Sequence, residues 1–222
     1  MTAAIFLNGE YEDDAYYLRA RERASFVVAA DGGHAFLRRH DLWPDLLVGD
    51  FDSLDGELLQ EAQEANVEIV RRPVRKDQTD GELAVAEACA RTTGEIVLLG
   101  ALGGDLDHLL GHLCVLRGLS QTGRGARIAA PGMAVRVFCG PYKVGLGAPV
   151  GTRVSLISLS PDAVVTLRGL EYPLTSAPLP ATTCLGVSNA VAAPGATVAL
   201  VSGVLALIVF DGDETFAGRR ER

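Results

Sequence analysis

Short apolar runs alternate with amphipathic segments through the first half of the chain. The apolar runs predict strands at 3–7, 25–30, 45–48, 67–71 and 95–99. The intervening segments predict helices at 13–23, 34–40, 54–65 and 80–91, and a leucine period of three and four residues predicts another helix after 105. Because strands alternate with helices, we expect an α/β fold, a mostly parallel open sheet with flanking helices.

The pattern changes after about residue 123. Short β-rich runs separated by Pro and Gly turns predict strands at 127–130, 134–139, 153–159, 164–167, 197–202 and 204–210. This pattern is typical of a smaller all-β sandwich. We therefore expect an α/β nucleotide-binding domain at 1–123 and a β-sandwich domain at 124–222, joined by the polar stretch 121–125 and ending in a frayed tail at 218–222.

Four acidic, glycine-rich segments lie where a predicted strand ends or a predicted helix begins. They read Ala-Asp-Gly-Gly at 30–33, Gly-Asp-Phe-Asp-Ser at 49–53, Lys-Asp-Gln-Thr-Asp at 76–80 and Gly-Gly-Asp-Leu-Asp-His at 103–108. Open parallel sheets bind ligands at this edge, and Mg²⁺ is usually held by one or two carboxylates plus substrate phosphates. The four segments together suggest a site for a magnesium-bound nucleotide.

Each segment also has a simpler structural interpretation. Asp and Gly are ordinary turn and cap residues, and Thr79 with Glu82 forms a capping-box pattern that predicts a helix start. Two carboxylates at Asp50 and Asp52 repel each other unless a cation or hydrogen-bond donors lie between them. The pair after the apolar run 46–48 therefore points most sharply to a metal.

In order and spacing, the four segments resemble the thiamine pyrophosphokinase (thiamin diphosphokinase) family. The resemblance includes Trp-Pro-Asp at 43–45, and it continues with Gly-Leu-Glu-Tyr-Pro-Leu at 169–174 and Gly-Val-Ser-Asn at 186–189. It covers nearly the whole chain, from Asn8 to Phe210. It implies transfer of a diphosphoryl group from ATP to the hydroxyethyl arm of thiamine with release of AMP, in a homodimer whose sites lie between subunits.

The resemblance also implies roles for individual residues. It assigns catalysis to Asp107, Lys76 and three aspartates that would also hold Mg²⁺, namely Asp50, Asp52 and Asp80. It assigns nucleotide binding to Asn8, Asp31, Gly32, Gly33, Asp77, Gln78, Thr79 and His108. It assigns thiamine binding to Tyr172, Ser188 and Asn189. From the residues alone, either Asp107 or Asp80 can take the proton of the attacking hydroxyl.

Three positions depart from the family pattern. Asp105 replaces an arginine, His112 replaces an asparagine and Ala190 replaces a glutamate. An arginine facing phosphates donates bidentate hydrogen bonds and charge, whereas an aspartate repels them. Two other functions therefore remain open: a noncatalytic relative that binds nucleotide or thiamine, and a diphosphokinase for another acceptor such as a hydroxymethyl pterin.

The spacing of Asp105, His108 and His112 stacks three potential ligands on one helical face. Such a set is able to bind a transition metal. The alternative is that Asp105 caps the helix while the histidines bond locally.

Composition narrows the class of partner. At 222 residues the chain exceeds one typical domain of about 100–150 residues. The formal net charge is −8 without a basic run, so we expect no nucleic acid partner. No apolar run approaches the roughly 20 residues of a membrane helix, and the first residues lack the apolar core of a signal. We expect a cytoplasmic protein with no membrane partner.

Overall fold

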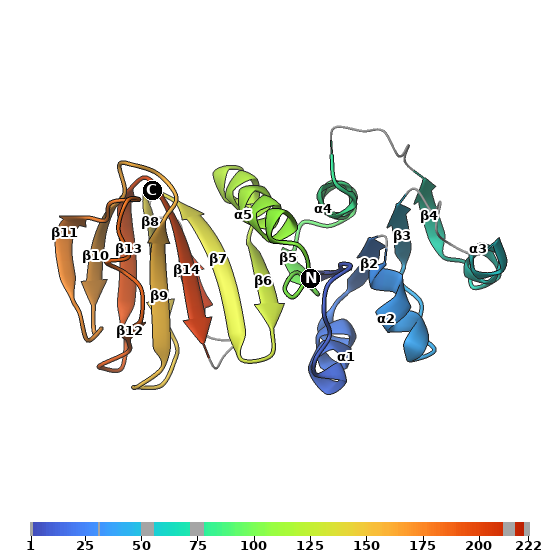
Figure 1. Ribbon diagram of the computed structural model, residues 1–222, viewed down its shortest axis with the longest axis horizontal. Helices are drawn as coiled ribbons and strands as arrows, with labels where there is room; N and C mark the ends of the chain where they lie inside the picture. Colours follow the sequence, from blue (N-terminus) through green and yellow to red (C-terminus); the bar gives the residue numbers. More distant parts are fainter. Residues whose placement is uncertain (1, 31, 50–55, 72–77, 211–215, 220–222) are drawn as a thin grey trace. The chain divides into compact units, whose positions relative to one another are not determined.

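The structure is a computed structural model (Figure 1) that describes residues 2–30, 32–49, 56–71, 78–210 and 216–219. The chain divides into two compact units, Met1–His112 and Leu113–Arg222. Helix α5 (Leu106–Gln121) runs through the division. The expected domain boundary between 123 and 124 lies after the end of this helix and stays a prediction.

The first unit is an α/β unit in which strands and helices alternate. Its strands are β1 (Thr2–Phe6), β2 (Phe26–Ala30), β3 (Leu46–Gly49), β4 (Glu68–Arg71) and β5 (Glu95–Leu99). Its helices are α1 (Asp14–Arg23), α2 (Gly33–Arg39), α3 (Gly56–Glu64), α4 (Asp80–Arg91) and the start of α5. The strands lie in the order β5-β1-β2-β3-β4, and every neighbouring pair is parallel.

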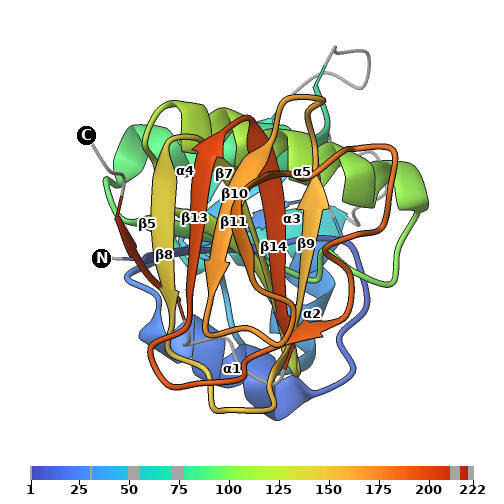
Figure 2. The same ribbon diagram turned by 90° about the vertical axis from the view of Figure 1, so that its left-hand side faces the viewer.

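Helices pack on the parallel strands. Helix α1 contacts β1 and helix α2 contacts β1 and β2, whereas α4 contacts β1, β2, β3 and β5. Figures 1 and 2 show α1 and α2 on one side of these strands and α4 on the other. The central strands are therefore buried on both faces, which explains why their sequences are apolar runs rather than alternating patterns.

Aromatic side chains fill the space between β1 and α2. Phe6 and Phe36 stack with centroids 5.6 Å apart, and Tyr11 stacks on Phe36 at 4.3 Å. The Tyr11 hydroxyl donates a hydrogen bond to the Leu7 carbonyl at 2.6 Å, which satisfies its polar end. Burial raises the pKa of Tyr17, which packs edge-on against Tyr11, to about 12. This cluster fixes the chain as it leaves β1.

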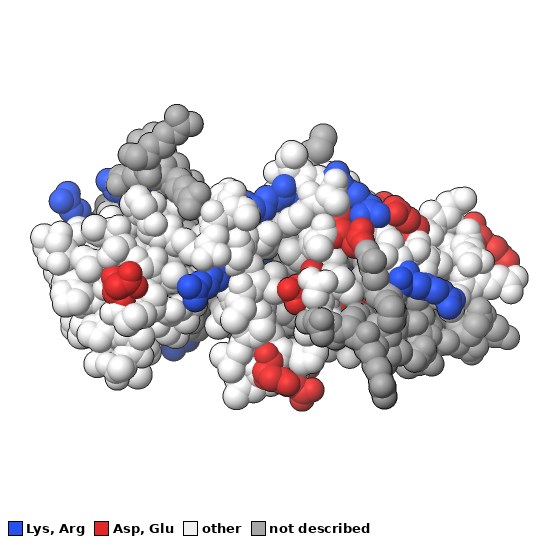
Figure 3. Space-filling model, turned by 90° about the horizontal axis from the view of Figure 1, so that it is seen from above, with Lys and Arg blue, Asp and Glu red and all other residues white. Residues whose placement is uncertain are grey.

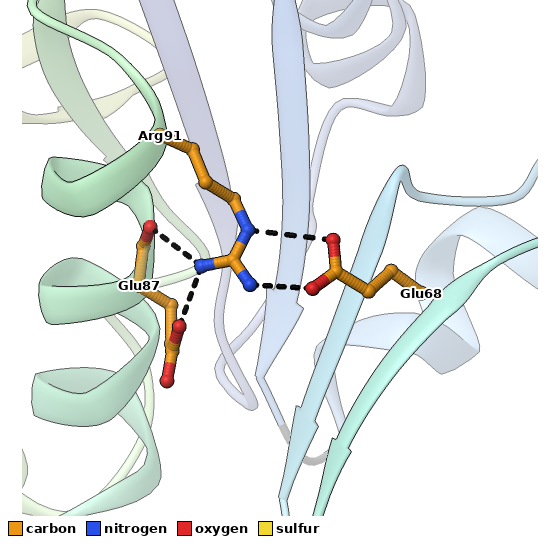
Figure 4. Close-up of polar contacts among 3 residues, drawn as sticks. All are labelled: Glu68, Glu87 and Arg91. Atoms are coloured by element: carbon orange, nitrogen blue, oxygen red, sulfur yellow. Dashed lines mark hydrogen bonds and ion pairs between the residues drawn. The ribbon is translucent and has the colours of Figure 1, made fainter.

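An arginine connects the end of α4 to the start of β4 (Figure 4). The Arg91 guanidinium donates through Nε and Nη2 to both carboxylate oxygens of Glu68, and through Nη1 to the carboxylate and backbone carbonyl of Glu87. The two carboxylates raise the pKa of Arg91 through these hydrogen bonds. The interaction connects α4 to an edge strand that α4 does not otherwise cover extensively.

Beyond α5, the described residues of the second unit form strands and no helix. Its strands are β6 (Ala126–Ala130), β7 (Met133–Cys139), β8 (Tyr142–Leu146), β9 (Arg153–Ser158), β10 (Val164–Arg168), β11 (Leu174–Pro178), β12 (Asn189–Ala190), β13 (Thr197–Ser202), β14 (Val204–Phe210) and β15 (Phe216–Arg219). Strands β12-β9-β14-β7-β6 lie side by side, and β11-β10-β13-β8-β15 form a second sheet. Within this unit the pairs are antiparallel.

The two sheets of the second unit share one core. Buried side chains from β7, β9 and β14 pack with others from β8, β10 and β13, including Phe138, Leu156, Val165, Val198 and Leu207. Inward residues alternate with outward ones along β10 and β13, as expected for a sandwich with one wet face per sheet. The predicted fold class is confirmed: a mostly parallel α/β sheet with helices, followed by an antiparallel β unit.

Four strands, β8, β11, β12 and β15, were not predicted from the sequence. Strand β11 contains Ser176 at φ 44°, and β12 has two residues, so neither gives a regular alternation. The frayed tail expected from 218 was wrong for Gly218 and Arg219, because these residues pair with β8 in β15.

Candidate functional site

A cavity of about 490 Å³ lies in the first unit where β1 and β5 end. Its lining comes from the residues after β1, the end of β2, the start of α4, the loop after β5 and the first turns of α5. These residues are Leu7, Asn8, Gly9, Ala30, Asp80, Gly81, Gly100, Ala101, Gly103, Gly104, Asp105, His108 and His112. The carboxyl ends of parallel strands are where open α/β sheets bind ligands.

Glycines allow the loops around this cavity to approach each other closely. A Cβ added at Gly9 would lie 2.1 Å from the Gly100 carbonyl oxygen, and one at Gly33 would lie 2.1 Å from the Phe6 carbonyl oxygen. Gly100 also has φ +62°, a backbone conformation that residues other than glycine rarely adopt. Backbone, rather than side chain, therefore forms much of the wall.

The structure brings together three of the residues predicted to bind nucleotide. Gly32 precedes α2 and Gly33 begins it, directly after β2. A Cβ at Gly32 would lie 2.0 Å from Oδ1 of Asn8, so the Asn8 amide occupies the space that Gly32 leaves. Asn8 is exposed and lines the cavity.

Helix α4 places Asp80 at the cavity. Thr79 is the N-cap, and its hydroxyl accepts a hydrogen bond from the Glu82 backbone N–H at 3.2 Å, so the predicted cap is confirmed. Asp80 is the first residue of the helix and lines the cavity, whereas Gln78 and Thr79 are exposed and do not. Of the three predicted metal ligands, Asp80 is the one that lies within the described residues, and it lines the cavity.

Helix α5 begins beside the same cavity. The Asp105 carbonyl accepts from the Leu109 N–H, as expected for the residue before a helix, and Asp105 and His108 line the cavity. Asp107 is exposed and is not part of the lining; its Oδ1 accepts from the His108 backbone N–H at 2.9 Å. Its predicted catalytic role stays a prediction.

His112 lies one turn further along α5 and is buried against the cavity. Burial lowers the pKa of His112, the neighbouring His108 lowers it further, and the backbone of Ala101 acts in the opposite direction. The two imidazole rings lie 6.4 Å apart. Across the described residues no three His, Cys, Asp or Glu side chains are grouped to hold a metal ion, so the transition-metal alternative for residues 105, 108 and 112 finds no support.

The cavity carries no described positive side chain. Its lining includes two carboxylates, Asp80 and Asp105, and neither Lys nor Arg in the described part of the chain. On the face drawn in Figure 3, blue basic side chains lie separately among white and red ones rather than in a continuous area. In the same described ranges, no helix is long and apolar enough to cross a membrane.

Five predicted site residues lie outside the described residues: Asp31, Asp50, Asp52, Lys76 and Asp77. Their neighbours Ala30, Gly49 and Gln78 are described, and the strands β2 and β3 both end just before the corresponding segments. The roles of these five residues stay predictions.

The predicted thiamine-binding residues lie together in the second unit. The Asn189 side chain is buried; its Oδ1 accepts from the Tyr172 N–H at 3.1 Å, and its Nδ2 donates to the Tyr172 carbonyl at 3.0 Å. Ser188 has φ +58°, and its N–H donates to Ser155 Oγ. Asn189 therefore holds the Tyr172 segment against β12, while the side chains of Tyr172 and Ser188 are exposed.

One acidic residue of the family-like motifs has a structural function. The Asp45 carboxylate accepts from the Val27 N–H at 2.7 Å, and the Asp45 backbone bonds to Val27 and Glu68. These bonds join the starts of β2, β3 and β4. The motif residue Asp45 thus aligns the strands whose far ends carry the predicted ligands.

Sequence reasoning missed several residues of the lining. Gly81, Gly100, Ala101 and Gly9 carry no chemistry of their own, and their importance arises from close approach to other backbone. The available signal was position: each follows a predicted strand or begins a predicted helix next to a residue that was singled out. His112 was noted as a departure from the family pattern and as a candidate transition-metal ligand, and not as part of the nucleotide site.

Comparisons with known proteins agree with this geometry. The family model "Thiamin pyrophosphokinase, catalytic domain" matches residues 17–127, and "Thiamin pyrophosphokinase, vitamin B1 binding domain" matches residues 146–205. Thiamine pyrophosphokinase of Bacillus subtilis (strain 168) is 27% identical over 183 residues, which cover 82% of this chain and 85% of that protein.

Solved structures give the same result. The crystal structure of thiamin pyrophosphokinase from Geobacillus thermodenitrificans superposes with a TM-score of 0.81 at 28% identity, covering 97% of this chain and 100% of that chain. That of the Bacillus subtilis protein has a TM-score of 0.81 at 25% identity, covering 96% and 100%. Two family models therefore match most of the chain, and its fold is theirs throughout. The chain belongs to the thiamin pyrophosphokinase family.

Proposed function

We propose that this protein is a thiamine diphosphokinase, which transfers a diphosphoryl group from ATP to thiamine. The observation that carries the proposal is the glycine-walled cavity with Asp80 at its edge, in a chain that both family models match. The thiamine hydroxyl oxygen forms a bond to the β-phosphorus of ATP. The bond from that phosphorus to the oxygen bridging the α- and β-phosphates breaks, so AMP leaves and thiamine diphosphate forms.

The cavity suits the nucleotide because it combines close-approach backbone with carboxylates. Glycines let phosphate and sugar oxygens approach the main chain. Asp80, together with Asp50 and Asp52 as proposed ligands, offers the hard oxygen donors that Mg²⁺ prefers. A bound Mg²⁺ neutralises charge that develops on the phosphate oxygens, and phosphoryl-type transfer asks for little else beyond positioning.

The remaining roles follow the family pattern as parts of the same proposal. Lys76 faces phosphate, Asp107 or Asp80 takes the hydroxyl proton, and Tyr172 and Ser188 contact thiamine while Asn189 holds their segment in place. Homodimer formation and a cytoplasmic location also belong to the proposal. ATP, Mg²⁺ and thiamine are the ligands to supply in its test.

The test is AMP release by the purified protein. With ATP, MgCl₂ and thiamine, we expect stoichiometric AMP and thiamine diphosphate, and loss of both when EDTA is added. Asp80→Asn should lower kcat strongly, because one ligand for Mg²⁺ loses its charge. Absence of AMP release from the wild type would refute the proposal, and a screen of other acceptor alcohols, a hydroxymethyl pterin among them, separates it from a diphosphokinase with a different acceptor.

A second function is a noncatalytic protein that binds nucleotide or thiamine. One observation favours it: Asp105, where the family pattern has arginine, lines a cavity whose described lining holds no cation. This function predicts calorimetric binding of Mg-ATP or thiamine without any turnover. Asp105→Arg should then create turnover, because it supplies a bidentate donor and removes a repulsive charge. Wild-type turnover excludes this alternative.

A further inference from the structure

His112 is a buried polar side chain that faces the candidate cavity. Its relative exposure is 9%, and its Nδ1 has no partner at hydrogen-bond distance within the described structure, although a polar interaction of the ring with the Ala101 backbone acts to raise its pKa. A buried polar atom without a partner costs about 1–3 kcal/mol and calls for an explanation. Because the side chain also lines a cavity, a ligand that interacts with the ring is a direct explanation.

The neighbouring glycine leaves space for the ring edge that carries Nε2. A Cβ added at Gly81 would lie 3.3 Å from Nε2 and 3.8 Å from Cδ2 of His112. Gly81 and His112 both line the cavity, and Gly81 directly follows Asp80 at the start of α4. The His112 ring therefore occupies the space that Gly81 leaves and forms part of the cavity wall beside the start of α4.

The chemistry of this side of the cavity favours uncharged ligand groups. Burial lowers the pKa of His112 and so favours the neutral ring, in which one nitrogen donates a hydrogen bond and the other accepts one. Asp105 adds a carboxylate that accepts hydrogen bonds and repels phosphate. Hydroxyl and amino groups, rather than phosphate oxygens, match this set of partners.

We infer that His112 is a positioning residue that hydrogen-bonds the ribose or base of the nucleotide in this cavity. The inference rests on the proposed function, because ATP supplies the nucleoside, and it assigns a contact to a residue that departs from the family pattern. The phosphates then lie toward Asp80 and its proposed magnesium ion. Gly81 contributes by leaving room for the ring.

The test compares His112→Leu with His112→Gln in the full-length protein. Leucine fills a similar volume without polar atoms, and glutamine restores a side chain that both donates and accepts hydrogen bonds. The probes are ATP with a methylene bridge between the α- and β-phosphates, and inorganic tripolyphosphate, each with MgCl₂ in a calorimeter. A neutral hydrogen bond corresponds to about a three- to tenfold change in affinity. We expect this loss for the ATP analogue in the leucine variant, recovery in the glutamine variant, and no change for tripolyphosphate.

A control and a stability measurement exclude a structural effect. His40 is the C-cap residue of α2 and lies beside Asp14, outside the cavity lining, so His40→Leu should leave both affinities unchanged. His112→Leu should keep or increase stability to urea, because it removes an unpartnered buried nitrogen. Unfolding of the variant at lower urea, together with equal losses for both probes, would overturn the inference.

Turnover assays separate this inference from the proposed function. If the wild type converts thiamine, we expect His112→Leu to raise KM for ATP three- to tenfold and to leave KM for thiamine unchanged. A wild type that turns over with an unaffected leucine variant refutes the role of His112 and leaves the proposed function intact. A wild type that neither turns over nor binds the ATP analogue refutes both.

Discussion

The contact of Arg91 with two glutamates should stabilise the first unit measurably. Arg91, Glu68 and Glu87 have side-chain exposures of 27%, 53% and 15%. Exposed ion pairs contribute about 0.2–1 kcal/mol, with fork-shaped arginine pairs at the upper end, and a helical pair four residues apart contributes about 0.3–0.5 kcal/mol. Arg91→Ala also removes the charged hydrogen bond that the largely buried Glu87 carboxylate accepts from the guanidinium. We therefore expect a loss of about 1–2 kcal/mol in the free energy of unfolding.

The geometry also predicts how variants differ. Arg91→Lys keeps the charge and loses the fork, so it should lose about half as much as Arg91→Ala. Raising NaCl to about 1 M shortens the Debye length to about 3 Å, so the difference in the free energy of unfolding between wild type and Arg91→Ala should become smaller. In a double-mutant cycle with Glu68→Ala, we expect a coupling energy of about 0.5–1 kcal/mol.

Urea unfolding followed by tryptophan fluorescence is the assay. Trp43 is the single tryptophan of the chain and lies in the first unit, where Arg38 stacks over its ring at 4.1 Å. Arg91 and Asp80 are at opposite ends of α4, about 16 Å apart along the axis, so KM for ATP should not change. A loss below about 0.3 kcal/mol, or a lysine variant as stable as the wild type, would contradict the reasoning.

Three further predictions follow from other contacts. Gly33→Ala should lower the free energy of unfolding by at least about 2 kcal/mol or prevent folding, because the added Cβ meets a backbone oxygen at 2.1 Å. Gly118→Ala places its Cβ in open space and should stabilise α5 by up to about 1 kcal/mol. Thermal melts of the two variants measure both effects. Burial raises the pKa of Tyr17 to about 12, above its unfolded value, so the stability that its neutral hydroxyl contributes is complete below pH 10 and is lost toward pH 12. The urea concentration at the unfolding midpoint should therefore fall between pH 10 and pH 12, and this fall should be smaller in Tyr17→Phe. Asn189→Ala should cost about 1–3 kcal/mol in urea unfolding followed by circular dichroism, because both backbone groups of Tyr172 lose a partner, and Asn189→Asp should cost less because it keeps the acceptor.

Much of the fold was predictable because local patterns and tertiary structure agree. The bounds of α4 follow from its cap and its apolar period, and β14 follows from a long apolar run. The strand order was not predictable, because periodicity does not say which strands pair. Strand β8 contains Lys143 and Gly145, whose types are unfavourable in strands, and it forms because β13 and β15 pair with it on either side.

The candidate site likewise contains residues that were predictable from the sequence and residues that were not. Asn8, Asp80 and His108 were predicted from motifs and line the cavity, because motif residues follow strand ends and strand ends converge. Asp107 belongs to the same motif as His108 but is exposed and does not line the cavity, because adjacent residues on a helix point about 100° apart. The buried position of His112 depends on the approach of α4 to α5 at Gly81, which no local pattern records.

The strand order of the first unit explains why a cavity opens where it does. The chain moves from β1 through β2 and β3 to β4 in one direction, and then returns across the sheet to place β5 on the other side of β1. The segment after β1 therefore leads to α1 on one face, whereas the segment after β5 leads to α5, whose His112 meets α4 on the other face. Two segments that leave neighbouring strands toward opposite faces necessarily diverge, and the crevice between them is where open sheets of this kind bind ligands. Because that crevice is produced by backbone topology, we expect substitutions at its rim such as Asp105 to change which ligand groups it accepts without closing it.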